Sequence, residues 1–217
     1  MARTASRGQV RGSYAPAETR KALLDSALRL FDEKGYHATS VEDIVIAAGV
    51  TKGALYHHFS GKEEILHQIQ EDYIDDRLRN ANAIMAEFET AVDRLKQLVL
   101  ESLVGIEQFR PHVAVFTQER RFLTEERFAA VKRKRDELDA IYESVIRQGI
   151  DEGVFDPKVE ARIASFGVLG MLGWAYNWYR PDGRLSVKEV AEQLSQLVLP
   201  GLLVREEAPR RSRARRS

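Results

Sequence analysis

The chain has 217 residues and no cysteine, and its 33 basic and 33 acidic residues give zero formal net charge at pH 7. The absence of cysteine excludes disulfide frameworks, thiolate zinc sites and cysteine nucleophiles. The most apolar segment, 164–179, is too short to span a membrane, and the N-terminus lacks the apolar core of a secretory signal, so we expect a cytoplasmic protein that does not contact a membrane.

Charge is distributed unevenly along the chain. Residues 1–16 contain three arginines and no acid, and residues 208–217 contain five arginines and no acid. The rest of the chain therefore has 25 basic against 33 acidic residues, a net charge of about −8. We predict a disordered basic arm over 1–16 and a disordered arginine-rich tail over 205–217. Two roles stay open for these ends, solubility and the attraction of a polyanion such as nucleic acid.

The first predicted helices follow one another closely. Residues 17–34 place apolar side chains at helical spacing up to Gly35, which ends the first helix. Ser40 stands three residues before Asp43, a spacing typical of a capping box, and starts a second helix that Gly49 ends. The tight turn after this second helix is typical of a helix-turn-helix unit, which we place in residues 17–62.

A third helix follows the tight turn, within the stretch TKGALYHHF at 51–59. Thr51 caps it, and Leu55 and Phe59 form its inner face, so the opposite face must look outward. A fourth helix starts at Ser60, with Glu63 as the predicted capping partner, and continues to about residue 88.

The rest of the chain, 63–204, also shows only helical periodicity. The further predicted helices span 91–107, 111–119, 124–153, 159–179 and 185–204. The predicted fold class is therefore all-α, with a small N-terminal helix-turn-helix domain and a larger C-terminal helical domain.

The two adjacent histidines of TKGALYHHF do not form a metal site, because neighbours on a helix point about 100° apart. No catalytic motif is present, and we expect no enzyme activity, metal or cofactor. A surface that reads DNA fits the stretch better. Lys52 can donate to guanine or phosphate, Gly53 permits close approach, and Tyr56 and His57 can donate to phosphate oxygens. The helix starts at Ser40 and at 60–62 offer free amides to phosphates.

At this point the sequence resembles a known family. The segment 27–66, ALRLFDEKGYHATSVEDIVIAAGVTKGALYHHFSGKEEIL, is similar to the DNA-binding domain of the TetR family of bacterial transcriptional regulators, with Val45 in place of a more usual alanine. The resemblance implies a homodimer that binds an inverted-repeat operator and is released by a small-molecule effector. The predicted DNA-binding residues are Thr39, Ser40, Thr51, Lys52, Gly53, Tyr56, His57 and Lys62.

The last two predicted helices favour a dimer. The segment ASFGVLGMLGWAYNWY at 164–179 is apolar around most of its circumference, so it must be covered on several sides. Its glycines permit close helix approach, and the final helix offers a second apolar stripe. Two copies could form a four-helix interface about a two-fold axis.

The effector is predicted less directly. An inter-helix pocket is expected between residues 84 and 179, because the family places its ligand there. We predict that it is mainly apolar with a basic mouth, which would suit an acyl-CoA thioester. The predicted ligand-binding residues are Phe109, Phe116, Arg120, Arg121, Tyr142, Trp174, Asn177 and Trp178.

A second resemblance supports this effector class. The segment 175–193, AYNWYRPDGRLSVKEVAEQ, is similar to one in TetR-type regulators of fatty-acid and steroid catabolism that respond to acyl-CoA. Three alternatives stay open: a TetR-type regulator of efflux that senses a hydrophobic drug, an architectural nucleic-acid binder led by its arginine-rich ends, and an enzyme that uses the helical pocket.

Overall fold

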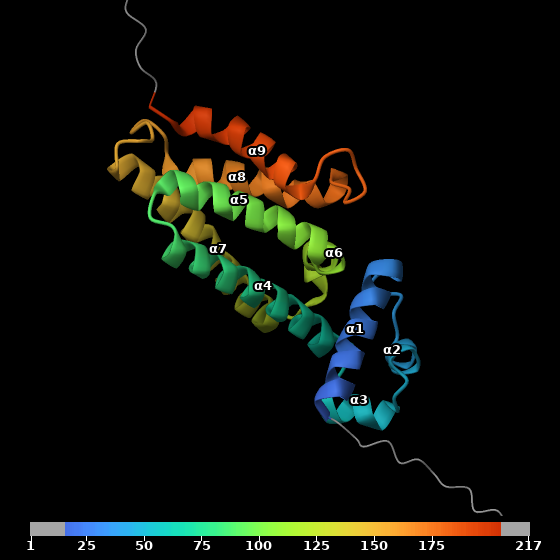
Figure 1. Cartoon of the computed structure of the whole chain (residues 1–217). Coiled ribbons are helices and arrows are strands. Elements are labelled where there is room, and N and C mark those ends of the chain that lie inside the picture. The colour runs from blue at the N-terminus through green and yellow to red at the C-terminus, as the bar shows by residue number, and fades with distance from the viewer. Residues whose placement is uncertain (1–15, 205–217) are drawn as a thin grey trace, which may run out of the picture.

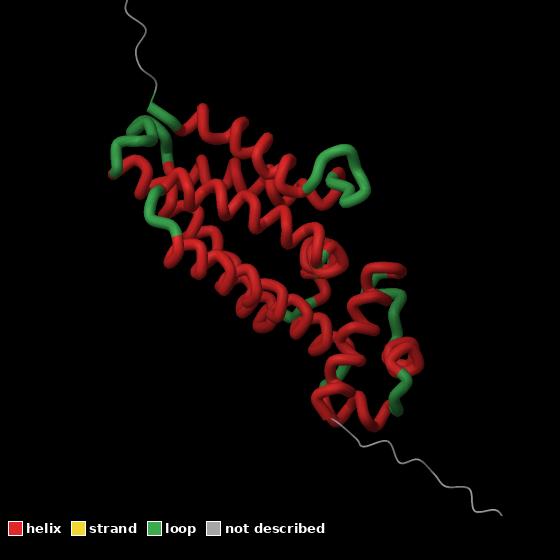
Figure 2. Tube along the Cα trace, viewed as in Figure 1, coloured by secondary structure: helices red, strands yellow, loops and turns green. Residues whose placement is uncertain are grey.

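The computed structural model describes residues 16–204. The two arginine-rich ends predicted to be disordered lie outside this range, except for Pro16, which is the first residue of the first helix. Within it, nine α-helices and one short 3-10 helix follow one another, and no strand is present (Figure 2). They are α1 Pro16–Lys34, α2 Val41–Ala48, α3 Lys52–His58, α4 Lys62–Glu87, α5 Ala91–Gln108, α6 Arg110–Gln118, η1 Arg120–Phe122, α7 Glu125–Asp151, α8 Ala161–Trp178 and α9 Val187–Leu202. The predicted all-α fold is confirmed.

The helices form two units joined by α4 (Figure 1). Helices α1 to α3 make a small unit at one end, and the long helices α4, α5, α7, α8 and α9 form an elongated bundle. Helix α6 crosses the end of the bundle and lies against α1 (Figure 1). No helix within residues 16–204 is long and apolar enough to cross a membrane.

A side-chain cap starts each of α2, α3, α5, α8 and α9. The predicted capping box of α2 is present, because the Ser40 hydroxyl accepts the Asp43 N–H at 3.0 Å and the Asp43 carboxylate accepts the Ser40 N–H at 2.8 Å. Gly49 ends α2 in the left-handed conformation at φ 66°, which glycine adopts without strain. The start of α4 differs from the prediction. Gly61 is its N-cap, and Ser60 binds Glu64 instead of Glu63, by its N–H and its hydroxyl, both at 2.6 Å.

Each unit has its own apolar core, but the cores do not divide at the predicted domain boundary. The core around α1 to α3 contains Leu23, Phe31, Ile44, Leu55 and Phe59, and also Ile65, Leu66 and Ile69 from the first turns of α4. It also includes the fully buried Val115 of α6. The N-terminal unit therefore depends on residues far along the chain to close its core.

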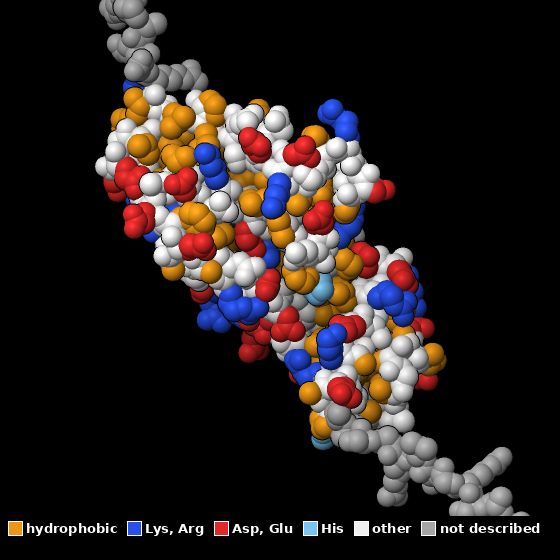
Figure 3. All heavy atoms as spheres, viewed as in Figure 1, with side chains coloured by type: hydrophobic (Ala, Val, Ile, Leu, Met, Phe, Trp, Pro, Cys, Tyr) orange, Lys and Arg blue, Asp and Glu red, His pale blue; other side chains and the backbone are white. Residues whose placement is uncertain are grey.

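The surface carries mixed charge. In Figure 3 acidic and basic side chains are interspersed over the visible face, and apolar side chains gather near the end of the bundle where α9 ends. This face presents no continuous basic area, so on this side DNA affinity would have to come from a few placed contacts.

Candidate nucleic-acid interface and ligand cavity

Helix α3 presents a small exposed surface on a fixed base. The Thr51 hydroxyl accepts the Ala54 N–H at 3.1 Å and so caps the helix. Leu55 and Phe59 are buried in the N-terminal core. This anchoring leaves the other face of the helix in solvent, and its exposed side chains include Lys52, Tyr56 and His57. The residues predicted to read DNA from this helix are thus brought together at one surface.

Gly53 also lies on this surface, at the first turn of α3, and a Cβ there would meet only the Thr51 hydroxyl at 3.8 Å. Ser40 is exposed at the start of α2, beside the capping carboxylate of Asp43. Its hydroxyl is already held by this capping box. Its position permits contact with a phosphate, although its side chain serves first to start the helix.

Two predicted DNA contacts take a different position in the structure. The Thr39 side chain is buried, and its hydroxyl donates inward to the carbonyl oxygens of Gly35 at 2.9 Å and Leu30 at 3.3 Å. It is therefore turned away from any ligand outside the protein. Sequence spacing alone did not show that Thr39 closes the α1–α2 turn from within.

Lys62 is the second predicted DNA contact whose side chain is used inside the protein. Its ammonium donates to the carbonyl oxygens of Tyr36 at 3.0 Å and Thr39 at 2.8 Å, and it lies 4.4 Å from the centre of the Tyr36 ring. Burial lowers the pKa of this ammonium. Because its donors are already engaged within the protein, Lys62 holds the α1–α2 turn onto the start of α4 and is poorly placed to reach a phosphate.

The same turn is held from the other unit by the segment after α6. The buried Glu119 carboxylate accepts the backbone N–H of Tyr36 at 3.2 Å. The ring of Phe122 in η1 stacks on the Tyr36 ring with 5.0 Å between centroids. Further along, the Glu63 carboxylate of α4 accepts the Thr124 N–H at 2.9 Å. The end of α6 and η1 is therefore attached directly to the turn that precedes α2.

A cavity of about 370 Å³ lies inside the bundle, between α4, α5, α6, α7 and α8. Its size falls within the range of small-molecule sites. Seven of its lining residues are apolar, and one of these seven, Phe116, was predicted to bind ligand. Gly173 of α8 also lines the cavity. The apolar lining comprises Ile74, Ile106, Val113, Phe116, Leu138, Leu169 and Leu172, and the polar lining comprises Tyr73, Arg77, Ser102, Thr117, Arg135 and Asp139.

The other predicted ligand residues lie outside this cavity. Trp174 and Trp178 are 65% and 46% exposed, and Asn177 is exposed on the same side of α8. They face away because the buried residues of α8, Leu172 and Ala175, take the inner positions of the helix. An apolar run shows that a helix is covered, but it does not show which residues face a cavity.

Three more residues that were predicted to bind ligand do not line the cavity. Tyr142 is fully buried beside the cavity and bonds Ser102 Oγ at 2.7 Å, so it orients a lining residue without lining the cavity itself. Phe109 packs edge-on against His112, with 5.6 Å between ring centroids. Arg121 is exposed and lies over the Phe122 ring, and Arg120 belongs to η1.

The prediction from the sequence placed the pocket between residues 84 and 179, so it left out the part of α4 that lines the cavity. Arg77 is buried there, and its guanidinium pairs with Glu101 at 2.7 Å and Asp76 at 3.0 Å. Gly105 leaves room for it, because a Cβ at that position would lie 2.0 Å from Arg77 Nη1. A charged residue in the apolar stripe of α4, between Ile74 and Ala81, was the signal that could have located this wall.

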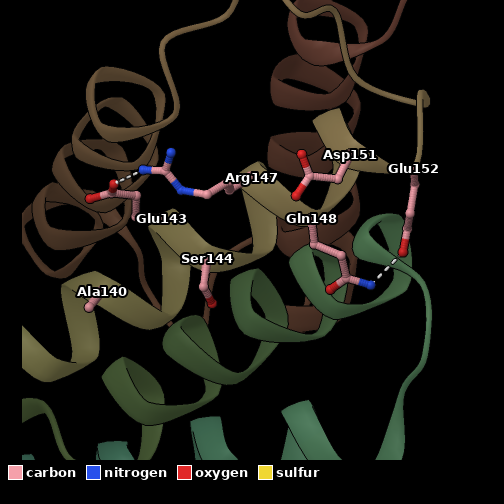
Figure 4. Close-up of a pocket in the computed structure, with 7 residues that line it drawn as sticks. All are labelled: Ala140, Glu143, Ser144, Arg147, Gln148, Asp151 and Glu152. Carbon is pink, nitrogen blue, oxygen red and sulfur yellow. Dashed lines mark hydrogen bonds and ion pairs between the residues drawn. The ribbon is translucent and has the colours of Figure 1, made fainter.

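A larger hollow of about 550 Å³ is an open groove on the outside of α7 (Figure 4). Its side chains all come from one helix, and Figure 4 shows that they pair among themselves, Glu143 with Arg147 and Gln148 with Glu152. Because most of its polar groups are paired and its lining comes from residues 140–152 alone, this groove is a poor ligand site.

No group of three or more His, Asp or Glu side chains is arranged to hold a metal ion in the part of the chain that the structure describes. The structure combines an exposed helix on a helix-turn-helix base, a cavity in a separate bundle, and a direct attachment between the two. Together they define a DNA-binding regulator with a ligand-binding domain.

Comparison with known proteins identifies the family. Residues 23–69 match "Bacterial regulatory proteins, tetR family", and residues 89–202 match "Tetracyclin repressor-like, C-terminal domain". The chain belongs to the TetR family, whose members are transcriptional regulators and not enzymes.

Three relatives are informative. The HTH-type transcriptional repressor KstR2 of Rhodococcus jostii is 35% identical over 185 residues, covering 84% of this chain and 90% of that protein. The structure of the ketosteroid transcriptional regulator KstR2 of Mycobacterium tuberculosis has a TM-score of 0.79 at 29% identity, covering 91% of this chain and 98% of that one. The structure of AibR in complex with isovaleryl coenzyme A and operator DNA has a TM-score of 0.76 at 27% identity, covering 84% and 98%.

Proposed function

We propose that this protein is a repressor that binds an inverted-repeat operator as a homodimer and is released by an acyl-CoA thioester. The observation that carries the proposal is the cavity, whose α6 wall leads directly into the Glu119 and Phe122 contacts with the turn before α2. The acyl-CoA class is supported by AibR, which was solved with isovaleryl coenzyme A and operator DNA, and the similarity to KstR2, a ketosteroid transcriptional regulator, fits a role in lipid breakdown.

The dimer is supported by an apolar face on α8 and α9. Ile163 is 67% exposed and Leu197 is 72% exposed, and Phe166, Trp174 and Trp178 are also exposed. A Cβ at Gly167 or Gly170 would meet nothing within 4 Å, so this side of α8 has room for a close helix. Exposed apolar faces of this kind mark interaction sites. A second copy of the chain is the partner that a two-fold operator requires.

The mechanism that we propose is a shift between two arrangements. An effector releases the protein from DNA only if it binds the released arrangement more tightly than the operator-bound one. An effector in the cavity would touch Phe116 and Thr117, one turn before Glu119. Movement of α6 would then pull on the α1–α2 turn and change the spacing of the two α3 helices in the dimer.

Operator binding in the presence of ligands tests this proposal. Fluorescence anisotropy with the DNA upstream of the protein's own gene would be measured with acyl-CoA thioesters, free coenzyme A, free acids and a cationic drug. We expect thioesters alone to weaken binding, and at about 100 times their Kd to stabilise the protein by roughly 2.7 kcal/mol in thermal melts. A response to the drug alone would instead support a regulator of efflux, and no specific operator binding would leave the architectural role.

The α3 surface can be tested separately. Tyr56→Phe removes one phosphate donor without a charge, so we expect about tenfold weaker binding to all DNA sequences and an unchanged salt slope. Lys52→Ala should relax the preference at one base pair if Lys52 reads a base, and lower the salt slope by about 1 if it binds a phosphate. Deletion of residues 208–217 should leave operator preference intact, which an architectural binder would not do.

A further inference from the structure

Two side chains of opposite charge line the cavity and influence each other electrostatically, but within the described part of the chain they make no hydrogen bond or close ion pair. Arg135 and Asp139 lie one turn apart on α7, and both face the cavity. Neither makes a hydrogen bond or an ion pair with any residue whose side chain the structure describes. The Arg135 guanidinium lies only over the Phe116 ring, 5.3 Å from its centre.

Several other charged side chains nearby already have a partner. On α7, Lys132 pairs with Asp136 at 2.6 Å and Lys134 pairs with Asp75 at 2.8 Å. Inside the bundle, Arg77 pairs with Glu101 at 2.7 Å. Arg135 and Asp139 therefore stay available on the cavity wall, where a bound molecule could reach them.

The cavity limits what such a molecule can be. Burial raises the pKa of the Asp139 carboxyl, with Arg135 acting in the opposite direction, so the carboxylate is held in a partly dry place without a donor. An anionic group would satisfy Arg135 but be repelled by Asp139, and a cationic group would do the reverse. A neutral group that carries both an acceptor and a donor satisfies both side chains.

We infer that the part of the effector inside the cavity carries a neutral donor–acceptor group, an amide or a hydroxyl beside a carbonyl. Arg135 donates to its acceptor and Asp139 accepts from its donor. This inference rests on the proposed effector role of the cavity. The cavity is too small for a whole coenzyme A thioester, so either of two parts can supply the group: an amide of the pantetheine arm, or an oxygenated acyl chain.

Calorimetric titration of the full-length protein tests the inference. The probes are octanoate, octyltrimethylammonium, the octanoyl thioester of N-acetylcysteamine, octanoyl-CoA and 3-hydroxyoctanoyl-CoA. We expect the amide-containing thioesters to bind at least about tenfold more tightly than octanoate or the cation, the worth of about one hydrogen bond. A preference for the N-acetylcysteamine thioester over octanoate places the group in the arm. A further preference for the hydroxylated chain places it in the acyl part.

Two variants make the test specific. Asp139→Leu should lose about tenfold in affinity for the preferred probes and lose the discrimination against octanoate. Asp136→Leu is the matched control, because Asp136 lies on the outer side of the same helix and pairs with Lys132. It should bind all five probes as the unmodified chain does. Operator binding without ligand confirms that each variant folds.

The outcomes separate the two proposals. Thioester binding with the same ratios in Asp139→Leu as in the unmodified chain overturns the donor–acceptor inference and leaves the proposed function standing. Tightest binding of octanoate or of the cation also overturns the inference. Binding that depends on Asp139 but never weakens operator affinity supports the inference and sinks the proposed release mechanism. Binding of no probe overturns both.

Discussion

Replacement of Glu119 by alanine should both destabilise the protein and disconnect its two units. In the structure the Glu119 carboxylate is 8% exposed and accepts the Tyr36 N–H at 3.2 Å, across 83 residues of sequence. No other acceptor for this N–H exists among the residues that the structure describes. Glu119→Ala would therefore leave a buried donor unsatisfied at the turn that positions α2.

The magnitude follows from that geometry. A hydrogen bond to a charged group contributes about 1.5–3 kcal/mol, and a buried donor left without a partner costs a similar amount. For a chain of this size, about 1 kcal/mol lowers Tm by roughly 2–4 °C, so we expect a fall of roughly 3–12 °C. Glu119→Gln keeps a carbonyl oxygen in place and should cost less than about 1 kcal/mol.

Two measurements check this reasoning, thermal melting and operator affinity with and without effector. We expect Glu119→Ala to keep operator binding at temperatures below its transition, while the loss of affinity caused by effector falls several-fold, since coupling energies are typically about 1–3 kcal/mol. Glu126→Ala, which removes an exposed carboxylate from the first turn of α7, is the control. A melting temperature within about 1 °C of the unmodified chain and an unchanged effector response would refute the idea that Glu119 connects the units.

Three further outcomes are expected. Gly149→Ala should destabilise the protein by about 1–3 kcal/mol in denaturant titrations, because a Cβ there would lie 2.1 Å from the buried Phe155 ring; an unchanged midpoint would contradict this. The backbone N–H of Ser186, followed by its hydroxyl, lowers the pKa of Glu189, so the contribution of Glu189 to stability is complete above the ordinary glutamate pKa and is lost as pH falls through the lowered value. Ser186→Ala keeps the backbone donor and removes the hydroxyl, so an NMR titration should show the Glu189 pKa rising part of the way back, and no rise would disprove the role of the hydroxyl. Lys62→Ala should lower Tm because it removes the donor shared by the carbonyls of the α1–α2 turn, and it should leave the salt slope of DNA binding unchanged; a slope lowered by about 1 would instead place Lys62 on a phosphate.

Local chemistry was the part of the fold that could be predicted. The caps at Ser40 and Thr51 depend on residues three positions away, so the sequence contains both partners. The inner positions Leu55 and Phe59 were predicted because helical periodicity fixes which side of α3 is buried. The same periodicity predicts that Lys52, Tyr56 and His57 are exposed on the opposite side of α3.

Long-range placement could not be predicted in this way. Thr39 and Lys62 were predicted to contact DNA because the resemblance to the TetR DNA-binding domain places contacts at these positions. In the structure both side chains donate to carbonyl oxygens in or beside the α1–α2 turn. The two tryptophans of α8 were expected in the cavity because aromatic residues suit ligands, yet they are exposed. Helical periodicity shows that one side of a helix is buried. Which buried residues line the cavity depends on how α4, α6 and α7 pack together.

The position of Val115 has a consequence for how such proteins can be recombined. This residue of α6 is fully buried in the core of the N-terminal unit, beside the contacts made by Glu119 and Phe122. A chimaera that joins residues 1–69 to the effector domain of another regulator would receive a foreign α6 and an incomplete core. A chimaera of two relatives should therefore fold only when Val115, Glu119 and Phe122 come from the same parent as the DNA-binding domain. Evolution should accordingly change this short segment of the effector domain together with the DNA-binding domain.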